Sequence, residues 1–332
     1  MARTRPQPLV ALVGGDTLLA REIRELLEDG PHGPRVQLIS AAGDGSASFA
    51  AGEEEALILT PLSAASLEGA SVALLAGSAA ASRRALKLIP PEGPRLIDLT
   101  GSLEDQPEAR LRAPSAEPAG TASSAGIQVI AHPAAIALAM LLGQLSKLGT
   151  VRRSVAHVFE PASERGQRGV EELQKQTVAV LSLKPLPTEV FDTQIAFNML
   201  ARYGEEAMEP LEGVEQRLER HLASLLHAWP GVAMPSLRLI QAPVFHGHSV
   251  SVWLEFDESP DAAAIAQALA SAGFDVRPDE PPANAGIAGL SGVSAGAIAT
   301  DPNNPRACWI WLVADNLKLA AENAVAVAKE SL

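Results

Sequence analysis

Histidine and carboxylate side chains in the second half of the chain have the types and the spacing that acid–base or metal chemistry uses. His246 and His248 are two residues apart at the edge of an expected strand, and a period of two places both rings on one face. This spacing suits a metal ion, with Glu160 as a conceivable third ligand. A chain with 7 histidines produces one such pair readily by chance, so we expect no metal. Without a metal, His248 and Glu160 could exchange protons with a carbonyl group.

A turn near the N terminus has the position of a dinucleotide site. Leu9–Val13 is a buried strand that leads through Gly14 to a helix, which Asp16 or Thr17 can cap. Backbone N–H groups at such a helix start can hold a pyrophosphate. The glycine fingerprint is reduced, since its three positions read Gly14, Thr17 and Ala20. NAD or NADP is therefore a doubtful cofactor, and the alternative is an ordinary first strand–helix unit.

The type of nucleotide is also constrained by charge. Residues 36–82 contain no Lys or Arg, although a 2′-phosphate of NADP is normally held by a basic residue in such a stretch. If a nucleotide binds, this composition favours NAD, with Asp44 as the partner of the ribose.

Two other motifs have simple explanations. Residues 292–296 match the Gly-x-Ser-x-Gly pattern of a hydrolase, but they fall inside a stretch rich in Gly and Ala, without the strand and helix that this motif requires. Cys308 lies within an apolar strand, where a small buried side chain is the expected role.

The composition limits the class of protein. The 332 residues are 47% hydrophobic and 20% charged, which indicates a globular chain of about two domains. A net charge of -13 argues against nucleic acid or an anionic membrane as the partner. The single cysteine excludes a disulfide framework, and the longest apolar stretch, Ile136–Leu142, is too short to span a membrane. We expect a soluble, cytoplasmic protein.

The first part of the chain alternates strands with helices. This order predicts an α/β domain with a Rossmann-like, doubly wound parallel sheet. Helices are expected at Leu18–Leu27 and Ser82–Leu88, and strands at Leu9–Val13, Arg35–Ser40, Leu57–Leu59, Val72–Ala76, Arg95–Leu99 and Gln128–Ala131.

From His132 the pattern changes to an α+β domain with a mixed or antiparallel sheet. Ser249–Asp257 alternates like a half-covered antiparallel strand, and Pro278–Pro305 is expected to be a long loop beside a site. The other expected strands are Arg152–Glu160, Leu237–Val244 and Cys308–Val313, and the expected helices are Pro133–Leu148, Gly169–Leu181, Leu211–Leu226 and Leu317–Lys329.

Five short stretches resemble one enzyme family. They are Glu171–Thr177, Pro187–Phe191, Ile195–Asn198, Pro243–Ser249 and Val313–Leu317. They resemble aspartate-semialdehyde dehydrogenase, occur in the same order as in that family, and span nearly the whole chain. The resemblance implies a nucleotide-binding domain at 1–132 plus 314–332, and a catalytic and dimerisation domain at 133–313 that forms a homodimer. The candidate nucleotide contacts are Gly14, Asp16, Thr17 and Asn316.

The same resemblance implies a reaction that this chain lacks the residues to perform. The family reductively dephosphorylates aspartyl phosphate with NADPH, through a cysteine thioester and a histidine acid–base. The histidine is kept as His248, but the cysteine position is Ala135. Glu160 replaces a glutamine and Gln241 an arginine, while Glu104 and Glu215 fall where the family has an arginine and a lysine. Together, these carboxylates would repel a dianionic acyl phosphate.

Three functions follow from these departures. The first is a catalytically silent member that serves as a binding or scaffold module, for a small ligand or a partner. The second is an oxidoreductase whose chemistry needs no thiol, with His248 and Glu160 as acid and base and NAD(P) as hydride carrier. The third is a metal-assisted hydrolase that uses His246 and His248.

Overall fold

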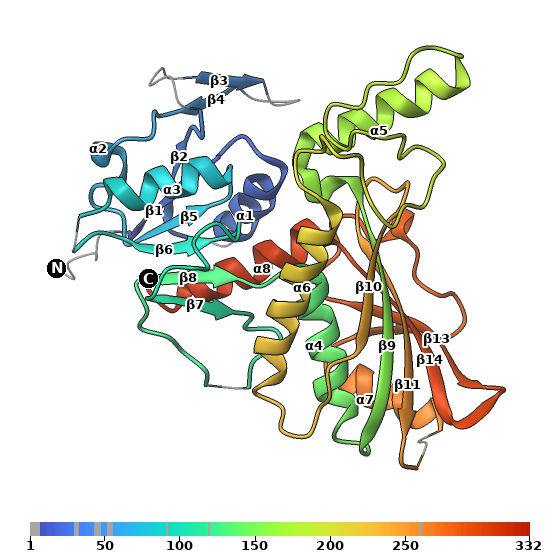
Figure 1. Cartoon of the computed structure of the whole chain (residues 1–332). Helices are drawn as coiled ribbons and strands as arrows, with labels where there is room; N and C mark the ends of the chain where they lie inside the picture. The colour runs from blue at the N-terminus through green and yellow to red at the C-terminus, as the bar shows by residue number, and fades with distance from the viewer. Residues whose placement is uncertain are drawn as a thin grey trace. The chain divides into compact units, whose positions relative to one another are not determined.

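The computed structural model describes residues 7–29, 33–42, 48–51, 56–90, 92–118, 120–258 and 261–332. Asp44, the expected ribose partner, lies outside these residues. The chain divides into two compact units (Figure 1). The first unit comprises Met1–Ala131 and Ala320–Leu332, and the second unit comprises His132–Leu319.

The first unit is built on a six-stranded parallel sheet, as the alternation of strands and helices predicts. The strand order is β2-β1-β5-β6-β8-β7, so the chain winds in both directions from β1 and β5. This confirms the Rossmann-like, doubly wound fold. The strands are β1 (Leu9–Val13), β2 (Arg35–Ile39), β5 (Val72–Leu75), β6 (Arg95–Asp98), β7 (Ala109–Arg112) and β8 (Ile127–Ile130); the helices are α1 (Leu18–Glu28), α2 (Ala64–Leu67) and α3 (Ala79–Leu88).

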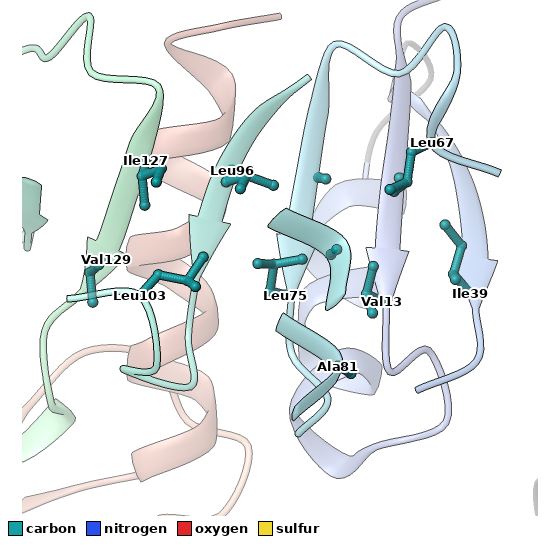
Figure 2. Packing of buried hydrophobic residues seen from close by; sticks show 12 residues of the cluster. Val13, Ile39, Leu67, Leu75, Ala81, Leu96, Leu103, Ile127 and Val129 are labelled. Carbon is teal, nitrogen blue, oxygen red and sulfur yellow. The ribbon is translucent and has the colours of Figure 1, made fainter. Parts of the chain in front are cut away.

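The core of the first unit lies where apolar strands face the helices. Parallel strands covered on both faces read as continuous apolar runs, and all the residues of β5 are buried. Val13, Leu75 and Leu96 come from neighbouring strands and point to the same side of the sheet (Figure 2). This packing holds the carboxyl ends of β1 and β5 in place, where the nucleotide turn is located.

One predicted strand of the first unit has a different partner. Leu57–Leu59 belongs to β4 (Ala56–Leu59), which pairs antiparallel with β3 (Ser48–Ala51) in a separate two-stranded sheet instead of extending the parallel one. The strand β7 is absent from the sequence prediction, because Ala-Arg-Leu-Arg has no apolar run to mark it.

The second unit is built on a mixed sheet, which confirms the predicted α+β domain. Its order is β10-β9-β11-β14-β13-β12, with β9–β10 and β12–β13 parallel and the remaining pairs antiparallel. The strands are β9 (Val151–Glu160), β10 (Ser236–Gln241), β11 (His248–Phe256), β12 (Asp275–Arg277), β13 (Ser294–Asp301) and β14 (Asn304–Ala314).

Helices cover this sheet and connect its edges. The helix α4 is buried over most of its surface, since it packs between α6 and α7 and also contacts β11 and β14 (Figure 1). The helices of this unit are α4 (Pro133–Leu145), α5 (Gly166–Leu181), α6 (Leu211–Leu226) and α7 (Ala262–Ser271), with short 3-10 turns η1 (Ala162–Arg165) and η2 (Asn284–Gly286). The last helix, α8 (Asn316–Lys329), begins in the second unit, and its residues from Ala320 onward belong to the first. Among the described residues, no helix is long and apolar enough to cross a membrane.

The prediction of a long loop at Pro278–Pro305 is wrong, because this stretch contains η2, all of β13 and the start of β14. Small residues here serve close packing: a Cβ on Gly296 would lie 2.8 Å from the carbonyl oxygen of Arg277 on the neighbouring strand. Ser294 opens β13 and donates to Asp275 from its hydroxyl. No helix follows it, so the Gly-x-Ser-x-Gly match is not a nucleophile turn.

Candidate functional site

Five polar residues of the second unit form a buried polar cluster where β9, β11 and α4 meet. Glu160 ends β9 and His248 begins β11. In the antiparallel ladder of β9 and β11, Ser249 pairs with Phe159. The neighbouring residues Glu160 and His248 therefore lie at the same end of the ladder. His132 is the N-cap of α4, and η1, which directly follows β9, supplies Glu164 and Arg165.

The carboxylate of Glu164 lies between the two imidazole rings. Its Oε2 is 3.9 Å from Nε2 of His132, and its Oε1 is 3.8 Å from Nε2 of His248. The ring centroids of the two histidines are 5.2 Å apart. Asn316 orients this carboxylate, because its Nδ2 donates to Glu164 Oε1 at 2.9 Å.

Arg165 holds the second carboxylate of the cluster. Its Nη2 lies 3.0 Å from Oε1 of Glu160, and its Nη1 lies 3.6 Å from Oε2 of Glu209. The Arg165 guanidinium also stacks over the ring of Tyr203, 5.6 Å from its centroid. The ion pair is nearly dry, since the side chains of Arg165 and Glu160 are 7% and 0% exposed.

Burial sets the charge states of these groups. It lowers the pKa of both the His132 and the His248 imidazoles, so both rings are neutral near pH 7. Burial also raises the pKa of Glu160 to about 7, against the opposing effect of the Arg165 charge. A neutral imidazole and a carboxyl group that exchanges its proton near pH 7 are the groups that acid–base chemistry needs.

Several polar atoms of the cluster have no hydrogen-bond partner among the described residues. They are Nε2 of His132, both ring nitrogens of His248, both carboxylate oxygens of Glu160, and Nε and Nη2 of Arg165, whose Nη2 makes the ion pair described above. Buried polar atoms in folded proteins are almost always paired with protein, water or a ligand. The concentration of such atoms in one place marks the cluster as the candidate site.

Gln241, a predicted site residue, braces the strands instead of presenting free donors. It pairs with Glu160 in the parallel ladder of β10 and β9. Its Nε2 donates to the backbone oxygens of Glu160 and Ala242, and its Oε1 accepts a 2.5 Å hydrogen bond from the Tyr203 hydroxyl. The remaining predicted catalytic position, Ala135, is the third residue of α4 and is fully buried.

His246 does not share a strand face with His248. It lies in the bend before β11, and Gly247 between them has a φ of +83°, so the extended backbone that the period-two argument assumes is absent. The histidine that the structure brings to His248 is His132, which is 116 residues earlier in the chain (248 − 132).

Asn316, a predicted nucleotide contact, belongs to the second unit and lies beside the buried polar cluster. Its Oδ1 accepts hydrogen bonds from the Ser163 hydroxyl at 3.0 Å and from the Gly247 N–H at 3.1 Å. Together with the bond to Glu164, these contacts fix both ends of its amide.

Sequence reasoning missed His132, Glu164 and Arg165 as site residues. One signal was available for His132, because it stands between a buried strand and a helix that begins with proline. Its place is further fixed by His221 of α6, whose Nδ1 accepts from the His132 backbone N–H at 2.9 Å. Nothing in the spacing alone links this position to the end of β9.

Glu104 and Glu215, the two carboxylates that are expected from the sequence to repel a phosphate, are not among the five residues of the buried polar cluster. Glu215 of α6 accepts from the backbone N–H of Leu239 at 2.6 Å and from Nη1 of Arg238 at 3.0 Å, so it anchors β10. Glu104 lies in the turns that follow β6 in the first unit.

The nucleotide turn of the first unit is tightly closed. Gly14 has a φ of +84°, and a Cβ there would lie 2.3 Å from Cα of Gly77. The hydroxyl of Thr17 donates to Ala76 O at 3.0 Å and accepts from the Ala20 N–H at 3.1 Å. Thr17 therefore caps the helix N terminus with its own side chain.

These residues do not fit a dinucleotide pyrophosphate. The second fingerprint glycine lets the phosphates approach the backbone, and Thr17 fills that position. The exposed carboxylate of Asp16 adds a negative charge at the same turn. A basic residue does reach the end of β2 from α3, because Arg84 Nη2 donates to the carbonyls of Ala41 and Ala42. Arg84 follows residues 36–82 in the chain, so the lack of Lys and Arg in that stretch does not leave the end of β2 without a basic group.

Comparisons with known proteins agree on one family. Residues 142–319 match the family model for the semialdehyde dehydrogenase dimerisation domain. The USG-1 protein homolog of Pseudomonas aeruginosa is 30% identical over 326 residues, which cover 96% of each chain. The aspartate-semialdehyde dehydrogenase of Prochlorococcus marinus is 25% identical and covers 98% of this chain and 96% of its own. A solved structure, a probable aspartate-semialdehyde dehydrogenase from Pseudomonas aeruginosa, has a TM-score of 0.82 at 27% identity, covering 98% of both chains.

Proposed function

The chain belongs to the aspartate-semialdehyde dehydrogenase family, and from this premise we propose that it is a homodimeric member without the family's phosphorylating dehydrogenase reaction. It uses the buried polar cluster to bind a small ligand and acts as a binding or scaffold protein. The observation that carries the proposal is Ala135 at the position of the nucleophile.

The single cysteine of the chain, Cys308, cannot serve as the nucleophile that is missing at position 135. Cys308 pairs with Leu254 in the β11–β14 ladder, six residues along the strand from His248. At about 3.3 Å per residue, this separates the thiol from the cluster by about 20 Å. Burial also raises the pKa of Cys308 to about 12, so almost no thiolate forms at neutral pH.

The charges of the cluster also oppose an acyl phosphate. The guanidinium of Arg165 faces the carboxylate of Glu160, and that of Arg217 lies 2.8 Å from Glu209. Each basic group is therefore already paired with an acid, and Glu164 adds a further negative charge between the imidazoles. A dianionic substrate would have to compete with these internal pairs.

The first unit supports the same conclusion for the cofactor. Because Thr17 and Asp16 do not suit a pyrophosphate, we expect NAD and NADP to bind weakly or not at all. The protein then lacks both the nucleophile and the hydride carrier of the family reaction.

The decisive test is an activity assay with the purified protein. Aspartate semialdehyde, NADP and either phosphate or arsenate are supplied, and we expect no thioester-dependent turnover. A calorimetric titration with NAD and NADP is expected to show no heat. Turnover through a thioester would overturn the proposal. Tight nucleotide binding without that turnover would instead favour the thiol-independent oxidoreductase, for which the proton-exchanging Glu160 and the neutral His248 are suited.

The homodimer rests on exposed apolar side chains in the matched dimerisation domain. Leu181 at the end of α5 and Phe197 in the following segment are 75% and 60% exposed. Gln176 holds that segment against α5, since its Oε1 accepts from the N–H groups of Ile195 and Ala196. A second copy of the chain would cover this surface.

Light scattering tests the dimer. Leu181→Glu combined with Phe197→Glu is expected to shift the mass from two chains to one. The matched control is Ile58→Glu, because Ile58 is 70% exposed but lies in the first unit, and it should leave the dimer intact. A wild-type mass of one chain would contradict the assignment.

A further inference from the structure

We infer that His132, Glu160 and His248 form a binding site for one divalent transition-metal ion such as Zn²⁺. This inference goes beyond the proposed loss of thioester chemistry, since metal binding is measured without turnover. It also replaces the pair that the sequence suggested, His246 and His248, with residues that the fold brings together.

The donor set and its geometry suit such an ion. One ligand atom from each of the three buried residues lies within 4.8 Å of the other two. Two imidazoles and one carboxylate are a common protein set for Zn²⁺ and for non-haem Fe²⁺. Ligand atoms that surround a tetrahedral ion at about 2.1 Å are about 3.4 Å apart. Side-chain rotations that move the ligand atoms by about an ångström would bring them to this separation.

The unpaired polar atoms are those that an ion would use. Nε2 of His132, both ring nitrogens of His248 and both oxygens of Glu160 have no hydrogen-bond partner among the described residues. The ion pair with Arg165 uses the Oε1 side of Glu160 and leaves Oε2 for the metal.

Neighbouring groups are placed to orient the ligands. Metal-binding carboxylates are usually held by a second hydrogen-bonding or charged group, which Arg165 provides for Glu160. Glu164 lies 3.8–3.9 Å from both imidazoles and is held by Asn316, so it can serve as a fourth ligand on the less buried side.

The local charge favours a cation over an anion. The guanidinium groups that act on the cluster belong to Arg165 and Arg217. They are outnumbered by the carboxylates of Glu160, Glu164, Glu209 and Asp315. An added divalent ion would reduce this excess of negative charge.

Metal binding at Nε2 of His132 requires the imidazole to change its tautomer. Its Nδ1 accepts a hydrogen bond from the Ala134 N–H at 3.2 Å, so the neutral ring carries its proton on Nε2. When Nε2 binds a metal, that proton moves to Nδ1 and the Ala134 N–H loses its acceptor. Amide hydrogen exchange at Ala134 should therefore become faster on metal binding.

The test uses tag-free, full-length protein that has been dialysed against EDTA. Zn²⁺ is titrated by calorimetry, and Co²⁺ by its visible absorbance, which reports the coordination number. We expect one ion per chain. His248→Gln and Glu160→Gln should each weaken Zn²⁺ binding at least about 100-fold, the upper range seen when even an outer-shell partner of a metal ligand is lost.

The matched control is His246→Ala, which removes a histidine only two residues from His248 and should leave the affinity unchanged. Circular dichroism establishes that each variant is folded, and the Co²⁺ spectrum of the wild type tests the site without any substitution. The inference is overturned if wild-type protein binds neither ion, or if the Zn²⁺ affinity is unchanged in His248→Gln and Glu160→Gln.

Discussion

Two buried arginines, Arg112 in the first unit and Arg165 in the second, have similar neighbours and opposite degrees of pairing. Every guanidinium nitrogen of Arg112 has an acceptor: Glu117 on Nε, Gln128 and Glu330 on Nη1, and Glu117, Glu330 and Thr121 on Nη2, at 2.6 to 3.1 Å. Arg165 has ion pairs to Glu160 and Glu209, and its Nε has no hydrogen-bond partner among the described residues.

The difference separates a structural network from a site. Arg112 connects β7 with Glu330, just after α8, so it fastens the end of the chain to the first unit. A guanidinium group whose nitrogens all have acceptors stabilises one arrangement and has no donor left for a ligand. Around Arg112, Nε2 of Gln128 lacks a hydrogen-bond partner among the described residues, whereas the cluster around Arg165 has several such atoms. The buried polar cluster around Arg165 keeps unpaired atoms in the interior, which costs stability unless something binds to them.

The largest expected effect is that of Arg112→Met. Removing this guanidinium leaves Glu117 and Glu330 without their cation, and breaking a buried pair in this way costs about 3–5 kcal/mol. Urea denaturation measures the free energy of unfolding. The control is Arg95→Met, which loses a hydrogen bond to Ser331 and an electrostatic attraction to Glu330, and which should cost about 1 kcal/mol. Equal costs for the two variants would remove the special role of Arg112.

The second effect is a pH dependence of opposite sign in the two regions. The Arg112 hydrogen bond lowers the pKa of Glu330, so its contribution to stability is present near neutral pH and is lost as the pH falls through that lowered pKa. Burial raises the pKa of Glu160 to about 7, so stability from this group is present below pH 4.5 and is lost as the pH rises through 7. The second change amounts to about 3 kcal/mol.

Unfolding curves from pH 2 to 8, recorded in EDTA, measure these contributions. Glu160→Gln should abolish the loss of stability between pH 5 and 8, and Glu330→Gln should abolish part of the loss in acid. If Glu160→Gln leaves the neutral-pH slope unchanged, the carboxyl group of Glu160 is not held in a costly environment, and the contrast with Arg112 fails.

A smaller effect is expected at the nucleotide turn. Thr17→Gly removes the cap of α1 and the hydrogen bond to Ala76, a total of about 1 kcal/mol. Thr17→Ser keeps the hydroxyl and is the control. Calorimetry should detect no NADP binding to either variant, because Asp16 is still present. Tight binding by Thr17→Gly would show that one side chain separates this turn from a working nucleotide site.

The fold was largely predictable because its elements carry strong local patterns. Buried parallel strands such as β5 are continuous apolar runs, and α6 begins and ends at the predicted residues. Local patterns failed where packing determines the structure. The small residues of β13 allow close approach to neighbouring chain segments at Gly296, and in sequence the same composition is typical of a loop.

The buried polar cluster was predictable only in part. The residue types of His248 and Glu160 mark them as candidates for acid–base chemistry, and His248 also stands at the histidine position of the family that the chain resembles. Their contact with His132 depends on the register of β9 against β11 and on a helix that starts at Pro133, and no local spacing encodes either. The positive φ of Gly247 likewise decides which histidine is the partner of His248.

Ala135→Cys has the smallest expected effect and provides the sharpest test of the comparison. It restores a cysteine at the nucleophile position of α4, the helix whose N-cap, His132, belongs to the buried polar cluster. The new thiol would lie in the first turn of α4, where the helix dipole lowers the pKa of a thiol, but the carboxylates of Glu160 and Glu164 oppose ionisation. We expect turnover of aspartate semialdehyde to stay at background. Alkylation by iodoacetamide at pH 7 should be slow, with buried Cys308 in the wild type as the unreactive reference. Measurable turnover would show that Ala135 alone accounts for the silent site, and that the charges around Arg165 still admit an acyl phosphate.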